Sequence, residues 1–292
     1  MRYKEDAHPP GLHIFEALKL RKELREKGAR LDTAMPLVVL EPEEGGGGEG
    51  GGGRGAREEI SGSAEIVKAF ASEELYFSSS SDDGNEKNAE IDSLVSEFDD
   101  KLGVAVRCFA YHSLLSKEDP AEVSMLATAC TDNTSHVESF LFKPYLTRGG
   151  GAGALKKFMK ITDETALSAE EDIRAAFKRA SRRLESEGGS EVYLIGGRFT
   201  AADLTLASLA SPLLLPPERN MAGFHFSALP PKFQTLASEL RATTAGKAVL
   251  ETYARHRGTR AVVYKSNGRN RLPVKGIVGA VGAVLLANVF IF

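Results

Sequence analysis

Residues 190–217 read SEVYLIGGRFTAADLTLASLASPLLLPP, and this stretch decides the fold. Within it, Thr200 is a typical N-cap residue, because its hydroxyl can accept a free backbone N–H of the first helical turn. Asp203 stands where its carboxylate can reach back to the N–H of Thr200, which completes a capping box. Phe199 and Leu204 flank the box at the spacing of a hydrophobic staple. The sequence therefore predicts a helix that begins directly after Thr200.

The predicted helix is apolar on nearly every side, through Leu204, Leu206, Ala207, Leu209 and Ala210. A helix that is apolar all round is buried. Prolines at positions 212, 216 and 217 predict where it ends. We therefore expect this helix at the centre of the core.

The pattern from Tyr193 to Leu204, YLIGGRFTAADL, resembles the motif that opens the central helix of the all-helical domain in the glutathione transferase family. In that family the motif contributes to folding and not to chemistry. The resemblance therefore implies structural roles for Phe199, Thr200, Asp203 and Leu204. Any buried helix with a capped start is the alternative interpretation.

Composition allows a large core and excludes several classes of function. The chain has 292 residues, of which 42% are hydrophobic, so one large domain or two smaller ones are expected. A net charge of −3 gives no global footprint for nucleic acid, and we expect no such partner. Cys108 and Cys130 form neither a CxxC pair nor a zinc pattern, and the histidines show no ligand spacing. We therefore expect no metal and a reducing compartment.

Composition shifts along the chain predict its domains. Residues 35–40, MPLVVL, read as a short strand headed by proline, and the glycine-rich run 45–55 reads as a flexible insertion. Residues 77–86 read as a polar linker. Residues 87–258 carry apolar residues at helical spacing, and a capping box at Ser168 predicts a helix start there.

The order of these segments again resembles the glutathione transferases. It implies an α+β fold class with a truncated thioredoxin-like α/β half at residues 1–76 and an all-helical domain at 87–258. A basic linker at 259–275 then leads to a C-terminal transmembrane helix at 276–292.

Residues 276–292 carry no charged side chain. As a helix they span roughly 26 Å, close to the ~30 Å hydrocarbon core of a bilayer. Basic residues upstream place residues 1–258 in the cytosol, with the folded part held at an organelle membrane by a tail anchor. The alternative is that this segment forms a helix packed on the core. We also expect that the protein can form a homodimer.

The resemblance also implies a glutathione site formed by Met35, Pro36, Ser63 and Glu65. Met35 and Pro36 stand where the family has a cis-proline whose preceding residue offers its backbone to glutathione. Ser63 stands at a helix start, a natural anion site, where the family holds the γ-glutamyl carboxylate. Gly62 replaces the family's acidic or amide residue before that serine. The alternatives are an ordinary trans proline and a plain N-cap.

The catalytic residue is not identifiable. The family's activating Tyr, Ser or Cys follows its first strand, but no Ser or Cys precedes Met35, and Tyr3 lies in a charged leader. Arg107 and Tyr111 are expected on a helix that lines the second-substrate pocket in the family. A polar face, either exposed to solvent or lying between helices, is the alternative interpretation of these two residues.

Two functions fit these patterns. The first is a membrane-anchored glutathione transferase-like protein that takes glutathione as substrate or ligand, although the missing activator argues against efficient conjugation. The second is a non-catalytic transferase-like protein acting in binding or organelle-surface interactions. Metaxins and the ganglioside-induced differentiation-associated proteins share that general plan.

Overall fold

The computed structural model describes residues 4–5, 37–40, 58–115, 120–131, 134–186, 193–219, 224–257 and 264–265. Its α-helices are α2 (Ser63–Leu75), α3 (Asp82–Glu97), α4 (Val104–Leu114), α5 (Pro120–Cys130), α6 (His136–Arg148), α7 (Gly151–Phe158), α8 (Asp163–Ser186), α9 (Ala201–Leu214), α10 (Pro231–Ala242) and α11 (Thr244–His256). A π-helical segment, η1 (Phe98–Gly103), joins α3 to α4, and two short 3₁₀ turns are η2 (Pro217–Arg219) and η3 (Phe226–Ala228).

The described strands are short and form two separate pairs. Strand β2 (Leu37–Leu40) pairs antiparallel with β3 (Glu58–Ser61). Strand β1 (Lys4–Glu5) pairs parallel with β4 (Tyr264–Lys265). Each sheet therefore has two strands.

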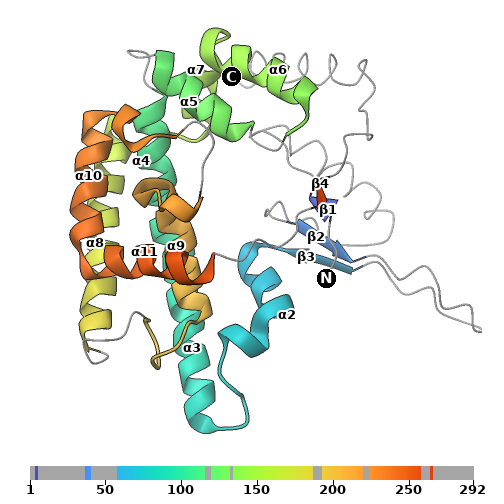
Figure 1. The fold of residues 1–292 in the computed structure, drawn as a ribbon, viewed down its shortest axis with the longest axis vertical. Helices are drawn as coiled ribbons and strands as arrows, with labels where there is room; N and C mark the ends of the chain where they lie inside the picture. Colours follow the sequence, from blue (N-terminus) through green and yellow to red (C-terminus); the bar gives the residue numbers. More distant parts are fainter. Residues whose placement is uncertain are drawn as a thin grey trace, which may run out of the picture.

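The expected α+β fold class is wrong for the part of the chain that the structure describes, which is almost entirely helical. A thioredoxin-like half requires one mixed sheet buried between helices, whereas β2 and β3 form only a pair of four-residue strands. Such a pair buries too little surface to form the core of a domain. The core lies instead among the helices that follow residue 82 (Figure 1).

The expectation of a transmembrane helix finds no support within the described ranges, where no helix combines the length and apolarity needed to cross a bilayer. Residues 276–292, which carried that expectation, lie outside the described residues, as do Met35, Pro36 and the run 45–55.

Helix α9 is the buried helix predicted from residues 190–217. It packs against α3, η1, α4, α10 and α11. Its side chains at Ala202, Leu206, Ala210 and Leu213 are each no more than 3% exposed. Because α9 is apolar all round, it can take neighbours on several sides at once.

Two helices begin earlier than the sequence predicts. Helix α8 starts at Asp163 and not near Ser168, because Thr162 and Thr165 exchange side chain-to-backbone hydrogen bonds of 3.1 and 2.8 Å one turn earlier. Helix α3 starts at Asp82, inside the expected linker, where the Ser81 hydroxyl accepts the N–H of Gly84 at 3.1 Å. In both cases a local cap sets the boundary.

Candidate functional site

The capping box at the start of α9 is a fully buried polar cluster. Oδ2 of Asp203 accepts the backbone N–H and the hydroxyl of Thr200 at 2.9 and 2.7 Å. Oδ1 of the same carboxylate accepts the N–H of Leu194 at 2.7 Å. Thr200 is 0% exposed and Asp203 is 4% exposed. Burial raises the pKa of Asp203, and the donated hydrogen bonds oppose that rise.

Phe199 and Leu204 flank the box and pack, partly buried, against the core. Phe199 also stacks on the ring of His256 with centroids 4.0 Å apart, and the hydroxyl of Tyr193 lies 3.1 Å from Nε2 of His256. These contacts fasten the end of α11 to the segment that leads into α9. The four residues of the predicted capping box therefore occupy structural positions.

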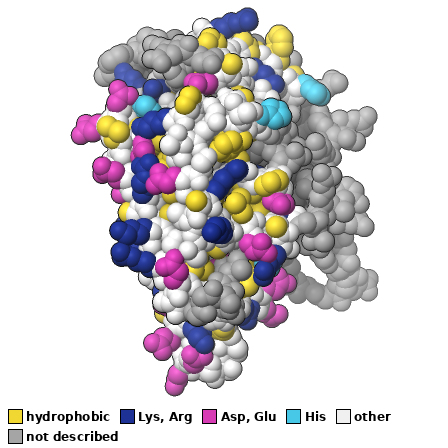
Figure 2. Space-filling view, turned by 60° about the vertical axis from the view of Figure 1, so that its left-hand side comes forward, with side chains coloured by type: hydrophobic (Ala, Val, Ile, Leu, Met, Phe, Trp, Pro, Cys, Tyr) yellow, Lys and Arg dark blue, Asp and Glu magenta, His cyan; other side chains and the backbone are white. Residues whose placement is uncertain are grey.

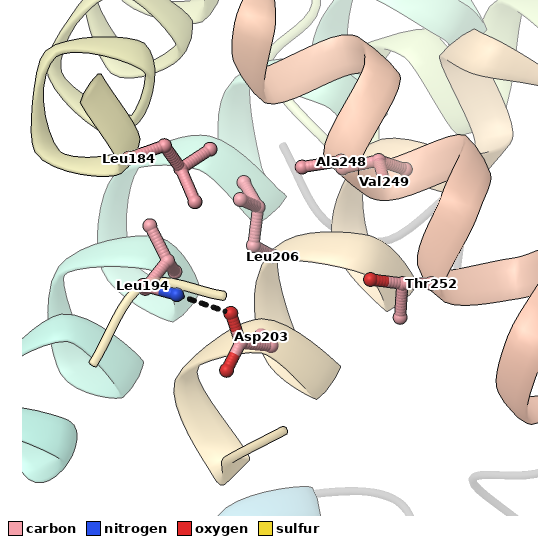
Figure 3. A pocket seen from close by; sticks show the side chains of 7 residues that line it. All are labelled: Leu184, Leu194, Asp203, Leu206, Ala248, Val249 and Thr252. Carbon is pink, nitrogen blue, oxygen red and sulfur yellow. Dashed lines mark hydrogen bonds between the residues drawn. The ribbon is translucent and has the colours of Figure 1, made fainter. Parts of the chain in front are cut away.

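A small cavity lies beside this box, between α8, α9 and α11 (Figure 3). It is lined by Leu184, Leu194, Asp203, Leu206, Ala248, Val249 and Thr252. Its volume is about 10 Å³, which is at the lower limit for one water molecule. Glutathione needs a site at least an order of magnitude larger, on the order of 300 Å³. The cavity is therefore a packing defect beside the box and not a substrate pocket.

A second polar cluster lies along α4 and contains the residues expected to line a second-substrate pocket. Helical spacing places Arg107 and Tyr111 together, and Cys108 beside His112. The Arg107 side chain is exposed, whereas Tyr111 is partly buried and its hydroxyl interacts electrostatically with Cys130 of α5. The structure therefore gives Tyr111 a partner on a neighbouring helix.

The other half of this α4 cluster faces the start of α8. Nε2 of His112 lies 2.7 Å from Oδ1 of Asp163. The Cys108 thiol donates a weak hydrogen bond of 3.7 Å to the hydroxyl of Thr165. Hydrogen bonding to His112 lowers the pKa of the exposed Asp163 carboxyl. These contacts join α4 to α8 at the surface.

The pKa shifts of Cys130 and Tyr111 argue against nucleophilic chemistry in this cluster. Burial raises the pKa of Cys130 to about 11, and the nearby Tyr111 hydroxyl opposes only part of that rise. Burial also raises the pKa of Tyr111 well above its ordinary value, and the nearby Cys130 adds to that rise. Both groups are therefore protonated at neutral pH, and Cys130 does not supply the thiolate that a cysteine nucleophile requires.

The expected glutathione residues lie apart from this cluster. Ser63 is the first residue of α2 and its side chain is exposed, while the N-cap position belongs to Gly62, whose φ of 92° suits glycine. Glu65 is exposed in the first turn of the same helix. Figure 1 shows α2 beside α3, whereas α5, which carries Cys130, lies at the far end of the molecule.

Helix α2 is held against α3 by contacts near its end. The Tyr76 hydroxyl donates to Asp92 at 3.1 Å, and the backbone of Phe77 exchanges two hydrogen bonds of 2.8 and 2.9 Å with the Asn88 side chain. The first turn of α2 takes no part in these contacts. Its N–H groups lack intrahelical partners by helix geometry, so an anion can bind there.

Sequence reasoning missed two members of the α4 cluster, Cys130 and Asp163. Helical spacing signals neighbours on α4 itself, but these partners come from α5 and α8 and are brought in only by tertiary packing. No group of three His, Cys, Asp or Glu residues that could hold a metal ion occurs within the described ranges.

In comparisons with known proteins, no family model matches the chain, and no curated protein or solved structure matches it.

Proposed function

We propose that this protein is a non-catalytic binding protein with a glutathione transferase-like helical body, and that it acts in interactions at an organelle surface. This is the second of the two functions expected from the sequence. The observation that carries the choice is the partly buried Tyr111–Cys130 pair, in which removal from water raises the pKa of both groups. At neutral pH Cys130 therefore supplies no thiolate, and the Tyr111 hydroxyl already interacts with a side chain of the fold.

Glutathione enters this proposal as a ligand and not as a substrate. Ser63 and Glu65 offer an exposed hydroxyl and a carboxylate at the first turn of α2, where the orphan N–H groups favour the γ-glutamyl carboxylate. Met35 and Pro36 complete the proposed site but lie outside the described residues. Ser63 lies inside the first turn and is not the N-cap residue, and its exposed hydroxyl has no hydrogen-bond partner among the described residues, so it can contact a ligand.

Retention on immobilised glutathione tests the ligand. We expect the full-length protein to be retained and eluted by free glutathione, and the Ser63→Ala variant to be retained less. Ser72→Ala is the matched control, since Ser72 is also exposed on α2 but lies near its other end. Equal retention of all three proteins contradicts the site, and no retention of any contradicts glutathione as the ligand.

Conjugation of glutathione to a chromogenic electrophile tests the absence of catalysis. We expect the rate with full-length protein to equal the uncatalysed rate, and Tyr111→Phe to leave it unchanged. Tyr145→Phe, on α6, is the matched control. A rate like that of an ordinary transferase, lost in Tyr111→Phe and kept in Tyr145→Phe, would show that the protein is an enzyme.

Attachment to a membrane through residues 276–292 stays a prediction, as does a homodimer. Alkaline carbonate extraction of the full-length protein, compared with a chain ending at Tyr264, tests the attachment. Release of the full-length protein by carbonate, or sedimentation of the shortened chain with membranes, contradicts it. Light scattering of the shortened chain tests whether dimerisation needs the tail.

A further inference from the structure

The outward face of α6 is apolar although it is exposed. Val137 and Phe140 are 48% and 77% exposed, and Pro144, one turn further on, is also exposed. On the opposite side of the helix, Phe142 and Leu146 are buried. Because α6 already has a buried side, its outward apolar face is not needed to hold the helix in place.

Helix α6 lies at the edge of the fold. It packs mainly on α5 and α7, and Figure 1 shows the three helices together at one end of the molecule, beyond the bundle formed by α8, α9, α10 and α11. The end of α7 presents a second large side chain, Phe158, which is 77% exposed. The two most exposed phenylalanine side chains of the described residues thus belong to one helical hairpin, formed by α6 and α7.

The same hairpin is basic, although the chain as a whole is acidic. Residues 136–160 contain five Lys and Arg residues and a single acid, Glu138, against a net charge of −3 for the full chain. Glu138 is 6% exposed and accepts the hydroxyl and N–H of Ser135 at the start of α6. The solvent-facing side of the hairpin therefore carries almost only positive charge.

Two of these cations lack acidic partners within the described ranges. Lys143 and Arg148 form no ion pair there, and both flank the apolar face of α6. Elsewhere in the bundle, Arg174 is paired with both Glu170 and Glu239 at 2.7 and 2.9 Å. At the upper end of Figure 2, where α6 and α7 lie, basic and hydrophobic side chains reach the surface together.

We propose that the outward face of α6, defined by Val137, Phe140, Pro144, Lys143 and Arg148, binds the surface of an anionic lipid bilayer. Exposed aromatic and aliphatic side chains gain by entering the boundary between headgroups and acyl chains, and flanking cations gain by meeting anionic headgroups. The positive charges of Lys143 and Arg148 favour a membrane with anionic headgroups. The exposed phenyl ring of Phe140 favours a bilayer over a purely polar partner. The inference goes beyond the proposed function and does not depend on residues 276–292.

Site-specific fluorescence tests the contact in the full-length protein. The chain contains no tryptophan, so Phe140→Trp introduces a single reporter on α6. Leu167→Trp is the matched control, because Leu167 is 58% exposed on α8. The probe is a vesicle of phosphatidylcholine and phosphatidylserine whose acyl chains carry bromine, a contact quencher of tryptophan.

We expect the Phe140→Trp emission to shift to the blue and to be quenched by these vesicles, and the Leu167→Trp emission to change little. Pure phosphatidylcholine vesicles, or high salt, should weaken the quenching at position 140. Equal quenching at both positions, or none at position 140 while the protein sediments with vesicles through its tail, overturns the proposal. Absence of any vesicle binding overturns it as well.

A charge variant separates lipid from other anionic partners. Lys143→Gln with Arg148→Gln should lower partitioning into the anionic vesicles roughly tenfold or more. Lys178→Gln with Arg182→Gln, two exposed cations of α8, is the charge-matched control and should change it little. If the first pair weakens binding to an oligonucleotide and leaves vesicle binding unchanged, the surface is a nucleic-acid contact and the lipid assignment is wrong.

Discussion

Replacing Asp203 with alanine isolates the energetic role of the buried capping box. The carboxylate accepts the N–H groups of Leu194 and Thr200 and the Thr200 hydroxyl, at 2.7, 2.9 and 2.7 Å. Leu194 and Thr200 are 1% and 0% exposed, so bulk water cannot take over as the acceptor. Asp203→Ala therefore leaves two buried backbone donors without their partner.

The magnitude follows from these two donors. A buried donor left unsatisfied costs about 1–3 kcal/mol, so two cost roughly 2–6 kcal/mol. The adjacent cavity of about 10 Å³ grows when the carboxylate is removed, and a water that enters it can satisfy one donor. We therefore expect the free energy of unfolding to fall by about 2–4 kcal/mol. Thr200→Ala keeps both backbone donors paired and should cost only about 1 kcal/mol.

Urea unfolding of the purified full-length protein, followed by circular dichroism at 222 nm, measures these changes as shifts in midpoint at constant slope. Asp172→Ala is the matched control, because Asp172 is exposed on α8, and it should stay within about 0.5 kcal/mol of the parent. An Asp203→Ala midpoint equal to that of Asp172→Ala would refute the reasoning, since the carboxylate would then not be the partner on which these donors depend.

Two further variants probe packing and ionisation. Gly246→Ala should destabilise the protein by at least about 2 kcal/mol, because a Cβ there would overlap the carbonyl oxygen of Leu240. A Cβ at Gly153 meets open space, so Gly153→Ala should stabilise the protein by up to about 1 kcal/mol. Equal unfolding midpoints for the two variants would contradict this account. The folded pKa of Cys130 is about 11 and its ordinary value is near 9.0, so between these values the unfolded chain loses this proton first and the free energy of unfolding falls as pH rises. The Cys130→Ser variant should lack that part of the pH dependence of stability, and identical pH profiles for parent and variant would show the pKa of the thiol to be unperturbed. Independently, iodoacetamide at pH 8 should modify Cys130 far more slowly in the folded protein than in urea.

The sequence by itself determined the features that depend on residues a few positions apart. Thr200 and Asp203 are three residues apart, so their capping box is visible in the sequence, and the apolar run after it predicts a buried helix because no polar face remains for solvent. The same local reasoning misplaced the start of α8. The Ser168 pattern suits a helix start, but the Thr162–Thr165 hydrogen bonds set it earlier.

Only the tertiary structure decided which segments meet. The strand at 37–40 was predictable from its apolar residues. Whether it joins a thioredoxin-like sheet depends on pairing with distant strands, and within the described residues its single partner is β3. Likewise the helical spacing of Arg107 and Tyr111 placed them on one face, yet the pKa of Tyr111 is set by burial and by Cys130, nineteen positions along the chain. Burial and the approach of a distant partner are properties of packing, because they arise only when separate helices exclude water together.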